Sequence, residues 1–268
     1  MITKRQDTVF EDRVFNGHSH VRVPTWQWPP RVRQTIKVGR FKGIDSFNYH
    51  EPERCLSMEE NLKKGDVLFD LGSLDGWLSA LYSQFVGAEN MCLFEPAPDA
   101  WPNIKAIWEE NHLPTPRHTF CGFVSDKTIL NPPEPDHDLG YRDGWPVVAY
   151  SDDLLGADGE MHFRSVRERS HDTPQTTLDD FVAFTGIVPD ALTVDVEGAE
   201  ILVLRGAPHV LRDLKPRLVW LSLHTINGAL TYDYHSSETE VLDLMTSYGY
   251  KGEWLGDEGD AHWIFKPC

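Results

Sequence analysis

The sequence lacks any apolar run long enough to cross a membrane. Its longest stretch without a charged residue, 218–232, has 15 residues, whereas a spanning helix needs about 20 apolar residues. The first 13 residues are polar and lack the apolar core of a signal peptide. Cysteine is scarce, with four residues and no CxxC pair. These absences predict a cytoplasmic protein with reduced thiols, no membrane partner and no disulfide framework.

Basic residues are also scarce, with 25 Lys and Arg against 42 Asp and Glu, a net charge of −17. Such a surface repels phosphate backbones, so we expect no nucleic-acid partner. Six basic residues and no acid nevertheless lie between positions 22 and 42, whereas 131–160 holds eight acids and one arginine. One interpretation is that Arg31, Arg33 and Arg40 bind an anionic acceptor through their planar guanidinium groups. The other is that this basic arm lies on the acidic segment.

From residue 65 onward, short apolar runs alternate with segments of helical periodicity. Strands are predicted at 66–71, 90–95, 117–124, 191–196 and 217–223, and helices follow them. Thr177 and Ser237 each stand three residues before an acid and so begin predicted helices with capping boxes. Residues 251–256 and 261–267 predict a terminal hairpin. The alternation predicts an α/β fold with a mostly parallel sheet and helices on both faces.

Two segments depart from this pattern. Residues 1–60 show no clean periodicity and include the Pro- and Trp-rich TWQWPP, which predicts an irregular N-terminal arm before a single domain at 61–268. Residues 131–173 are turn-rich, with VVAY (147–150) and MHFRSV (161–166) as candidate short strands. An excursion of this length inside a compact domain is usually functional or disordered, and we interpret it as a lid-like insertion.

The first candidate site follows the 66–71 strand, where DLGSLDG (70–76) forms a turn before a helix. Ligands of open α/β sheets bind at the carboxyl ends of strands. Glu95 ends the next strand, 19 residues after Gly76, where an acid can accept both ribose hydroxyl hydrogen bonds of an adenosine. The spacing is G-x-x-x-G, not the G-x-G-x-x-G of dinucleotide sites, which disfavours a nicotinamide oxidoreductase and favours S-adenosylmethionine. The predicted cofactor-binding residues are Asp70, Gly72, Ser73, Gly76, Glu95, Pro96 and Gly122.

The second candidate site is acidic. Asp195 lies near the end of the 191–196 run, Glu197 follows that run and His224 follows 217–223, so both groups should face the same crevice. His224 is a candidate general base with an ordinary pKa of about 6.5, and Asp195 is the other candidate. Glu197 is predicted to be catalytic with them, by positioning a substrate hydroxyl. A histidine here can also be purely structural. Twelve histidines form no HxH or HExxH pattern, so no zinc site is predicted; Mg²⁺ held by Asp195 and Glu197 is a less favoured alternative.

Over about residues 65–267 the sequence resembles the FkbM-type methyltransferases. The specific parts are TLDD (177–180), DVEGAE (195–200) and VLRGA (203–207). The resemblance implies a Rossmann-like class I fold with a seven-stranded sheet whose last strand is antiparallel, and S-adenosyl-L-methionine-dependent O-methylation of a hydroxyl on a sugar or secondary metabolite. The chain departs from the family pattern at Ser73, Leu74, Thr193 and Ser222. A catalytically silent binding or assembly module with the same fold is the alternative.

Overall fold

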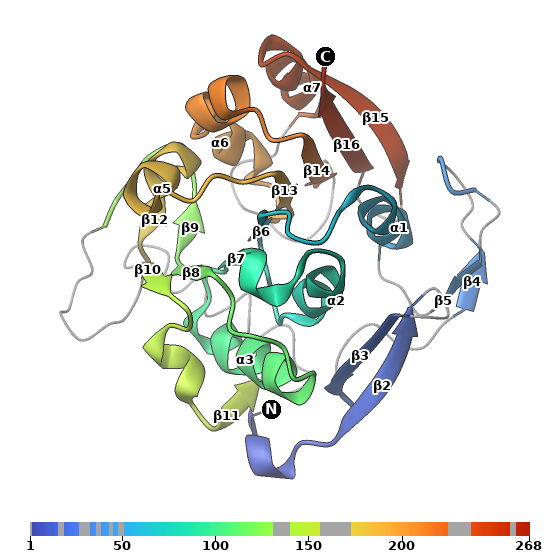
Figure 1. Cartoon of the computed structure of the whole chain (residues 1–268), viewed down its shortest axis with the longest axis vertical. Coiled ribbons are helices and arrows are strands. Elements are labelled where there is room, and N and C mark those ends of the chain that lie inside the picture. The colour runs from blue at the N-terminus through green and yellow to red at the C-terminus, as the bar shows by residue number, and fades with distance from the viewer. Residues whose placement is uncertain are drawn as a thin grey trace.

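The computed structural model describes most of the chain around one large mixed sheet (Figure 1). The described residues are 2–15, 19–26, 33–35, 39–42, 45–47, 51–130, 140–155, 173–224, 237–257 and 261–268. No helix within these ranges is both long and apolar enough to span a membrane.

The main sheet has eight strands in the order β10-β8-β7-β6-β13-β14-β16-β15. Their bounds are β6 Leu68–Leu71, β7 Met91–Phe94, β8 His118–Cys121, β10 Gly140–Asp143, β13 Ala191–Val194, β14 Leu218–Leu223, β15 Tyr250–Asp257 and β16 Ala261–Pro267. The five central strands, β8 to β14, are parallel, while β16 runs antiparallel to β14 and pairs with β15 as a hairpin. The carboxyl ends of β6, β7, β13 and β14 therefore meet at one edge.

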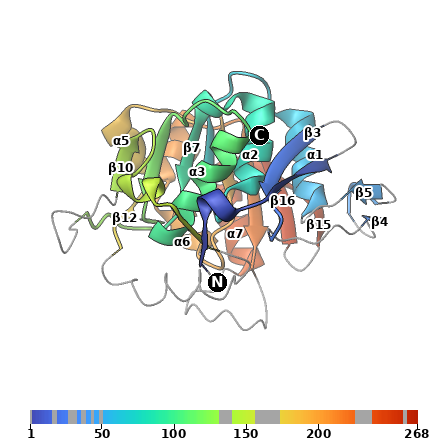
Figure 2. The ribbon, with the colours of Figure 1, turned by 90° about the horizontal axis from the view of Figure 1, so that it is seen from below.

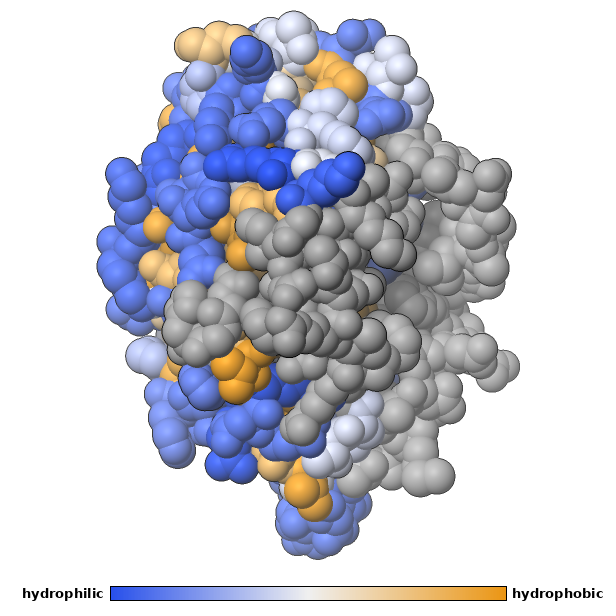
Figure 3. Space-filling model, turned by 90° about the vertical axis from the view of Figure 1, so that its right-hand side faces the viewer, coloured by the Kyte–Doolittle hydropathy of each residue, from blue (hydrophilic) through white to orange (hydrophobic). Residues whose placement is uncertain are grey.

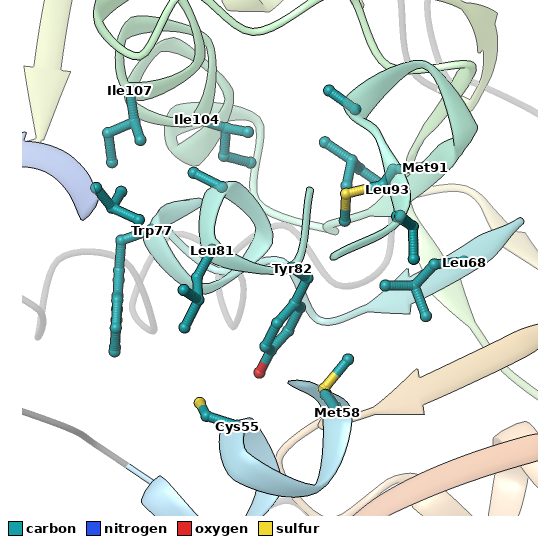
Figure 4. Packing of buried hydrophobic residues seen from close by; sticks show 14 of the residues in the cluster. Cys55, Met58, Leu68, Trp77, Leu81, Tyr82, Met91, Leu93, Ile104 and Ile107 are labelled. Atoms are coloured by element: carbon teal, nitrogen blue, oxygen red, sulfur yellow. The ribbon is translucent and has the colours of Figure 1, made fainter. Parts of the chain in front are cut away.

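Helices cover both faces of the sheet (Figures 1 and 2). Their bounds are α1 Pro52–Asn61, α2 Trp77–Val86, α3 Trp101–Glu110, α5 Leu178–Thr185, α6 Glu200–Arg205 and α7 Glu238–Ser247, with a π-helical turn, η5, at Val210–Leu214. The first three helices pack on one face and the others on the opposite face, since successive strand residues such as Leu68 and Phe69 belong to different core clusters. Figure 4 shows the first cluster, where Tyr82 of α2 points toward Cys55 and Met58 of α1.

The predicted fold class is confirmed, with two local corrections. VVAY (147–150), expected as a strand, is a 3-10 helix, η4 Val147–Tyr150. The sheet has eight strands where seven were expected, because β10 pairs antiparallel with β8 at its edge. Both predicted N-caps form: Thr177 Oγ1 accepts the Asp180 N–H at 2.9 Å and Ser237 Oγ accepts the Glu240 N–H. The Thr177 N–H donates to Thr128 Oγ1 and not to Asp180, so only the N-cap half of that box forms. The other expected insertion strand, MHFRSV, lies outside the described residues.

The first 60 residues, expected to be irregular, contain regular elements. Short strands β1 Ile2–Lys4 and β11 Asp153–Leu155 pair with each other, as do β4 Arg33–Thr35 and β5 Asp45–Phe47. The hairpin of β2 Phe10–Phe15 and β3 Ser19–Pro24 packs on the helices, and the Phe15 ring stacks on Trp77. Smaller elements are β9 Phe123–Val124, β12 Gln175–Thr176, and 3-10 turns η1 Arg5–Asp7, η2 Ala88–Asn90 and η3 Pro98–Ala100.

The face beside α1 and β15 shows mostly hydrophilic described residues, with apolar ones in small groups among them (Figure 3). Trp254, on the edge strand β15, is 41% exposed. The division of the chain into an arm (1–60) and a domain (61–268) stays a prediction. Phe15, Val21, Val23 and residues of α1 belong to the same apolar cluster as α2 and α3.

Candidate functional site at the carboxyl edge of the sheet

Close packing of its backbone fixes the conformation of the glycine turn that follows β6. Gly72 and Gly76 have φ of +88° and +90°, which L side chains rarely adopt. A Cβ at Gly72 would lie 1.8 Å from the Asp195 carbonyl oxygen, and one at Gly76 would lie 2.8 Å from Ile104 Cα. The turn is thus pressed against the start of the 195–200 loop on one side and against α3 on the other. This contact brings the two predicted sites together.

Asp70 is buried at the end of β6. Ser79 of α2 donates a hydrogen bond to its carboxylate, and Ser73 Oγ lies 3.4 Å from the same oxygen. Burial raises the pKa of Asp70 to about 6, against the opposing effect of the Ser79 hydrogen bond and the Arg54 charge. Ser73 therefore helps to hold the Asp70 carboxylate, which the sequence assigns to the cofactor site.

Glu95 ends β7 with only 3% of the residue exposed. Its two carboxylate oxygens accept the N–H groups of Leu74, at 2.9 Å, and Ala97, at 2.8 Å. Burial raises its pKa to about 8 in spite of these two hydrogen bonds. Leu74, which donates one of them, has a left-handed φ of +51° and is 38% exposed. The carboxylate is thus fixed in direction beside the glycine turn.

This arrangement fits the nucleoside of S-adenosyl-L-methionine. A carboxylate has about four lone-pair positions, so one that accepts two backbone N–H groups can still accept hydroxyl donors. A vicinal diol donating two hydrogen bonds would offset the desolvation of ionised Glu95. Asp70 and Glu95 would hold the cofactor, with Ser73 and Pro96 in the adjoining turns. S-Adenosyl-L-methionine supplies a methyl group on a positively charged sulfur.

The second cluster joins three acids and one histidine from adjacent strand ends. His224 Nδ1 lies 2.8 Å from Glu200 Oε1, whose side chain is fully buried. The other ring nitrogen, Nε2, lies 3.5 Å from Asp195 Oδ1 and 3.5 Å from Glu197 Oε2. The side chains of His224 and Asp195 are 19% exposed and that of Glu197 is 33% exposed. All three residues proposed as catalytic therefore face one partly open space.

The carboxylates change the chemistry of His224. Burial alone opposes the charged imidazolium, but the Glu200 hydrogen bond and the charges of Asp195 and Glu197 raise its pKa to about 10. The sequence-based expectation of an ordinary pKa near 6.5 is wrong for this environment. At neutral pH the ring carries a proton in the ligand-free chain.

Sequence reasoning missed Arg54, the buried cation of the site. It lies on α1, where it contacts Asp195 Oδ2 at 2.8 Å and Ser222 Oγ at 3.0 Å and pairs with Glu51. Only 2% of the residue is exposed, and these acids outweigh burial to raise its pKa well above the ordinary value. Ser222 also lies 3.1 Å from His262 Nδ1. The serine that departs from the family pattern therefore serves as a partner of Arg54.

The remaining predicted residues are Gly122 and the three arginines. Gly122 directly follows β8, at the same edge of the sheet as Glu95, and a Cβ there would meet the Pro174 carbonyl oxygen at 2.5 Å. Its role in cofactor binding stays a prediction. Arg40 pairs with Glu60 at 2.6 Å and Glu253 at 3.3 Å, neither of which belongs to the 131–160 segment. Arg31 lies outside the described residues, and Arg33 is described only as part of β4. Roles of these arginines toward an acceptor stay predictions.

A family model for the methyltransferase FkbM domain matches residues 70–251, a segment that includes Asp70, Glu95, Asp195 and His224. No curated protein sequence matches the chain.

Solved structures with a related fold are distant in sequence. A methyltransferase FkbM from Methylobacillus flagellatus KT is 16% identical, with a TM-score of 0.48 over 76% of this chain. The match spans only 44% of that longer protein. The magnesium protoporphyrin IX methyltransferase ChlM of Synechocystis PCC 6803, solved with bound SAM, is 13% identical, with a TM-score of 0.41 over 81% of this chain and 76% of its own. Aeropyrum pernix fibrillarin is 13% identical, with a TM-score of 0.40 over 96% and 100% of the two chains.

Proposed function

The chain belongs to the FkbM methyltransferase family, and from this premise we propose that it transfers a methyl group from S-adenosyl-L-methionine to a hydroxyl oxygen of a small acceptor. The observation that carries this proposal is the position of two distinct polar clusters on one edge of the sheet. Glu95 and Asp70 lie at the ends of β7 and β6, and Asp195, Glu197 and His224 lie beyond β13 and β14. We assign the first cluster to the cofactor and the second to the acceptor.

The contact between Gly72 and the Asp195 carbonyl supports this division. It leaves no room for a side chain between the turn and the 195–200 loop. A nucleoside that binds at Glu95, beside the glycine turn, therefore lies close to the acceptor residues of the neighbouring 195–200 loop. Holding the two reactants in line is the main contribution that a protein makes to a displacement of this kind.

The acceptor hydroxyl must lose its proton during the transfer. Because His224 is protonated at neutral pH in the ligand-free chain, the lone pairs that face the space belong to Asp195 Oδ1 and Glu197 Oε2. Arg54 holds the other oxygen of Asp195 and so directs Oδ1 toward His224. We assign the proton acceptor to Asp195, with His224 stabilising the negative charge beside it.

The charges of this cluster favour a neutral acceptor rich in hydroxyl groups, such as a sugar or a secondary metabolite. Four carboxylates, Glu51, Asp195, Glu197 and Glu200, lie around two cations, Arg54 and His224. An anionic acceptor would meet net repulsion here. A cytoplasmic location and the absence of a nucleic-acid partner stay predictions.

The test is a methylation assay with S-adenosyl-L-methionine and a panel of neutral sugars, sugar phosphates and amines, read by mass spectrometry of the products. We expect O-methylated products from neutral polyols. Asp195→Asn should lower the rate by about 10²–10⁴, whereas Asp213→Asn, which changes an exposed acid paired with His209, should not. Cofactor binding without turnover on any alcohol, or turnover that survives Asp195→Asn, would contradict the assignment.

A further inference from the structure

The Asp195–Glu197–His224 cluster has the composition and spacing of a metal-binding site. One ligand atom from each residue lies within 4.8 Å of the other two. His224 Nε2 is 3.5 Å from Asp195 Oδ1 and from Glu197 Oε2. Two ligands bound at about 2.1 Å and separated by 90° to 109° lie about 3.0–3.4 Å apart, so the two distances to His224 Nε2 are close to those of ligands on one ion.

The groups around the cluster orient its ligand atoms. Metal-bound histidines usually donate their second ring N–H to a carboxylate, which fixes the tautomer and the direction of the ligating nitrogen. Glu200 occupies that position toward His224 Nδ1 at 2.8 Å, and its side chain is fully buried. Arg54 occupies the equivalent position toward Asp195, because it binds Oδ2 at 2.8 Å and leaves Oδ1 facing His224.

The site is also accessible. The three side chains are 19%, 19% and 33% exposed, so an ion can enter and keep further coordination positions open. One imidazole nitrogen with two carboxylate oxygens suits first-row divalent cations such as Mn²⁺ better than Mg²⁺, which prefers oxygen ligands alone.

We propose that Asp195, Glu197 and His224 bind one divalent transition-metal cation of the Mn²⁺ type at the acceptor end of the site. The open positions of the cation face the space assigned to the acceptor, whose oxygen becomes a further ligand. Asp195 Oδ1 then acts as a ligand, so the proton-acceptor role assigned to it above applies to the chain without the cation. The ligand role of the acceptor oxygen rests on the proposed methyltransferase function, but binding of the cation does not.

The experiment titrates Mn²⁺ into chelator-treated protein and measures free Mn²⁺ by electron paramagnetic resonance. We expect one bound Mn²⁺ per chain, with saturation below about 1 mM, the weak end of protein sites for divalent cations. Glu197→Gln and His224→Gln should each weaken binding at least about tenfold, and Glu200→Gln, which changes only the orienting partner, by about tenfold. The control is His209→Gln, which breaks an exposed His–Asp pair and should bind Mn²⁺ as the wild type does.

Glu197→Gln is the most informative variant, because its side chain is the most exposed of the three and its loss is least able to disturb the fold. Absence of bound Mn²⁺ from wild type at 1 mM, or equal binding by wild type and Glu197→Gln, would overturn the proposal. Calorimetry with S-adenosylhomocysteine on the same samples separates the two hypotheses. If the nucleoside binds and Mn²⁺ does not, only the metal site is wrong; if Mn²⁺ binds and the nucleoside does not, the proposed function is wrong.

Discussion

Cofactor affinity should depend on the ionisation of Glu95. Burial raises the pKa of this carboxyl to about 8 in the ligand-free chain, and ribose hydroxyls donate best to the ionised form. Because binding requires loss of the proton, affinity should increase as pH rises through 8 and level off above it. Between pH 7 and pH 9 the gain expected from this group is about tenfold, since ionising it at pH 7 costs about 1.4 kcal/mol.

Glu95→Gln tests this reasoning and sets its magnitude. The substitution replaces two hydrogen bonds to a charged acceptor, each worth about 1.5–3 kcal/mol. After the ionisation cost of the wild type at pH 7 is subtracted, the net loss is about 2–4.5 kcal/mol, or about 30- to 2000-fold in Kd. At pH 9 the wild type no longer bears that cost, so the ratio of the two Kd values should widen by about tenfold.

Isothermal titration calorimetry with S-adenosylhomocysteine at pH 7 and pH 9 measures both effects. The ligand's own amino group titrates identically against both proteins, so the ratio of the Kd values isolates Glu95. Glu89→Gln, a change in an exposed acid on η2, provides the control and should leave Kd unchanged. An unchanged ratio between the two pH values, or a Glu95→Gln variant that binds like wild type, would refute the role of Glu95.

Three further predictions concern stability and titration. Arg54→Gln leaves buried Glu51 and half-buried Asp195 without their cation and should lower the free energy of unfolding in urea by about 3–5 kcal/mol. Arg205→Gln, at an exposed pair with Glu240, should cost about 0–1 kcal/mol; similar costs for the two variants would refute the Arg54 network. Gly76→Ala should lower Tm more than Gly186→Ala does. Both glycines have a positive φ, but only at position 76 would the new Cβ meet backbone, that of Ile104; equal Tm shifts would contradict this packing. In chelator-treated protein, an NMR titration should show the His224 ring protonated through neutral pH with a midpoint near 10, and a midpoint near the ordinary 6.5 would return the base role to His224.

The sequence predicts the central sheet well because its strands are short, mostly apolar runs that end in distinctive residues. LFDL of β6 and MCLF of β7 are fully buried, and each leads into an acid or glycine turn with a strong conformational preference. The edge strand β10 has no such pattern, since GYRD carries two charged residues and pairs with β8 only in the folded chain. Its existence depends on tertiary contact and not on local sequence preference.

The candidate site was predictable only in part, for a related reason. Asp195, Glu197 and His224 follow apolar strands, so their meeting at one edge follows from topology. Arg54 lies in PERCLSMEEN, a polar segment outside the predicted alternation of strands and helices, and only the packing of α1 against β14 and the β15–β16 hairpin brings it to Asp195. The pKa of His224 depends in the same way on Glu200, which α6 contributes from another turn of the chain.

The most direct test of the central claim is a crystal structure of the chain with S-adenosylhomocysteine. The account predicts both ribose hydroxyls within hydrogen-bond distance of the Glu95 carboxylate, with the sulfur directed toward the space lined by Asp195, Glu197 and His224. A nucleoside bound away from Glu95, or a sulfur directed away from Asp195, would contradict it.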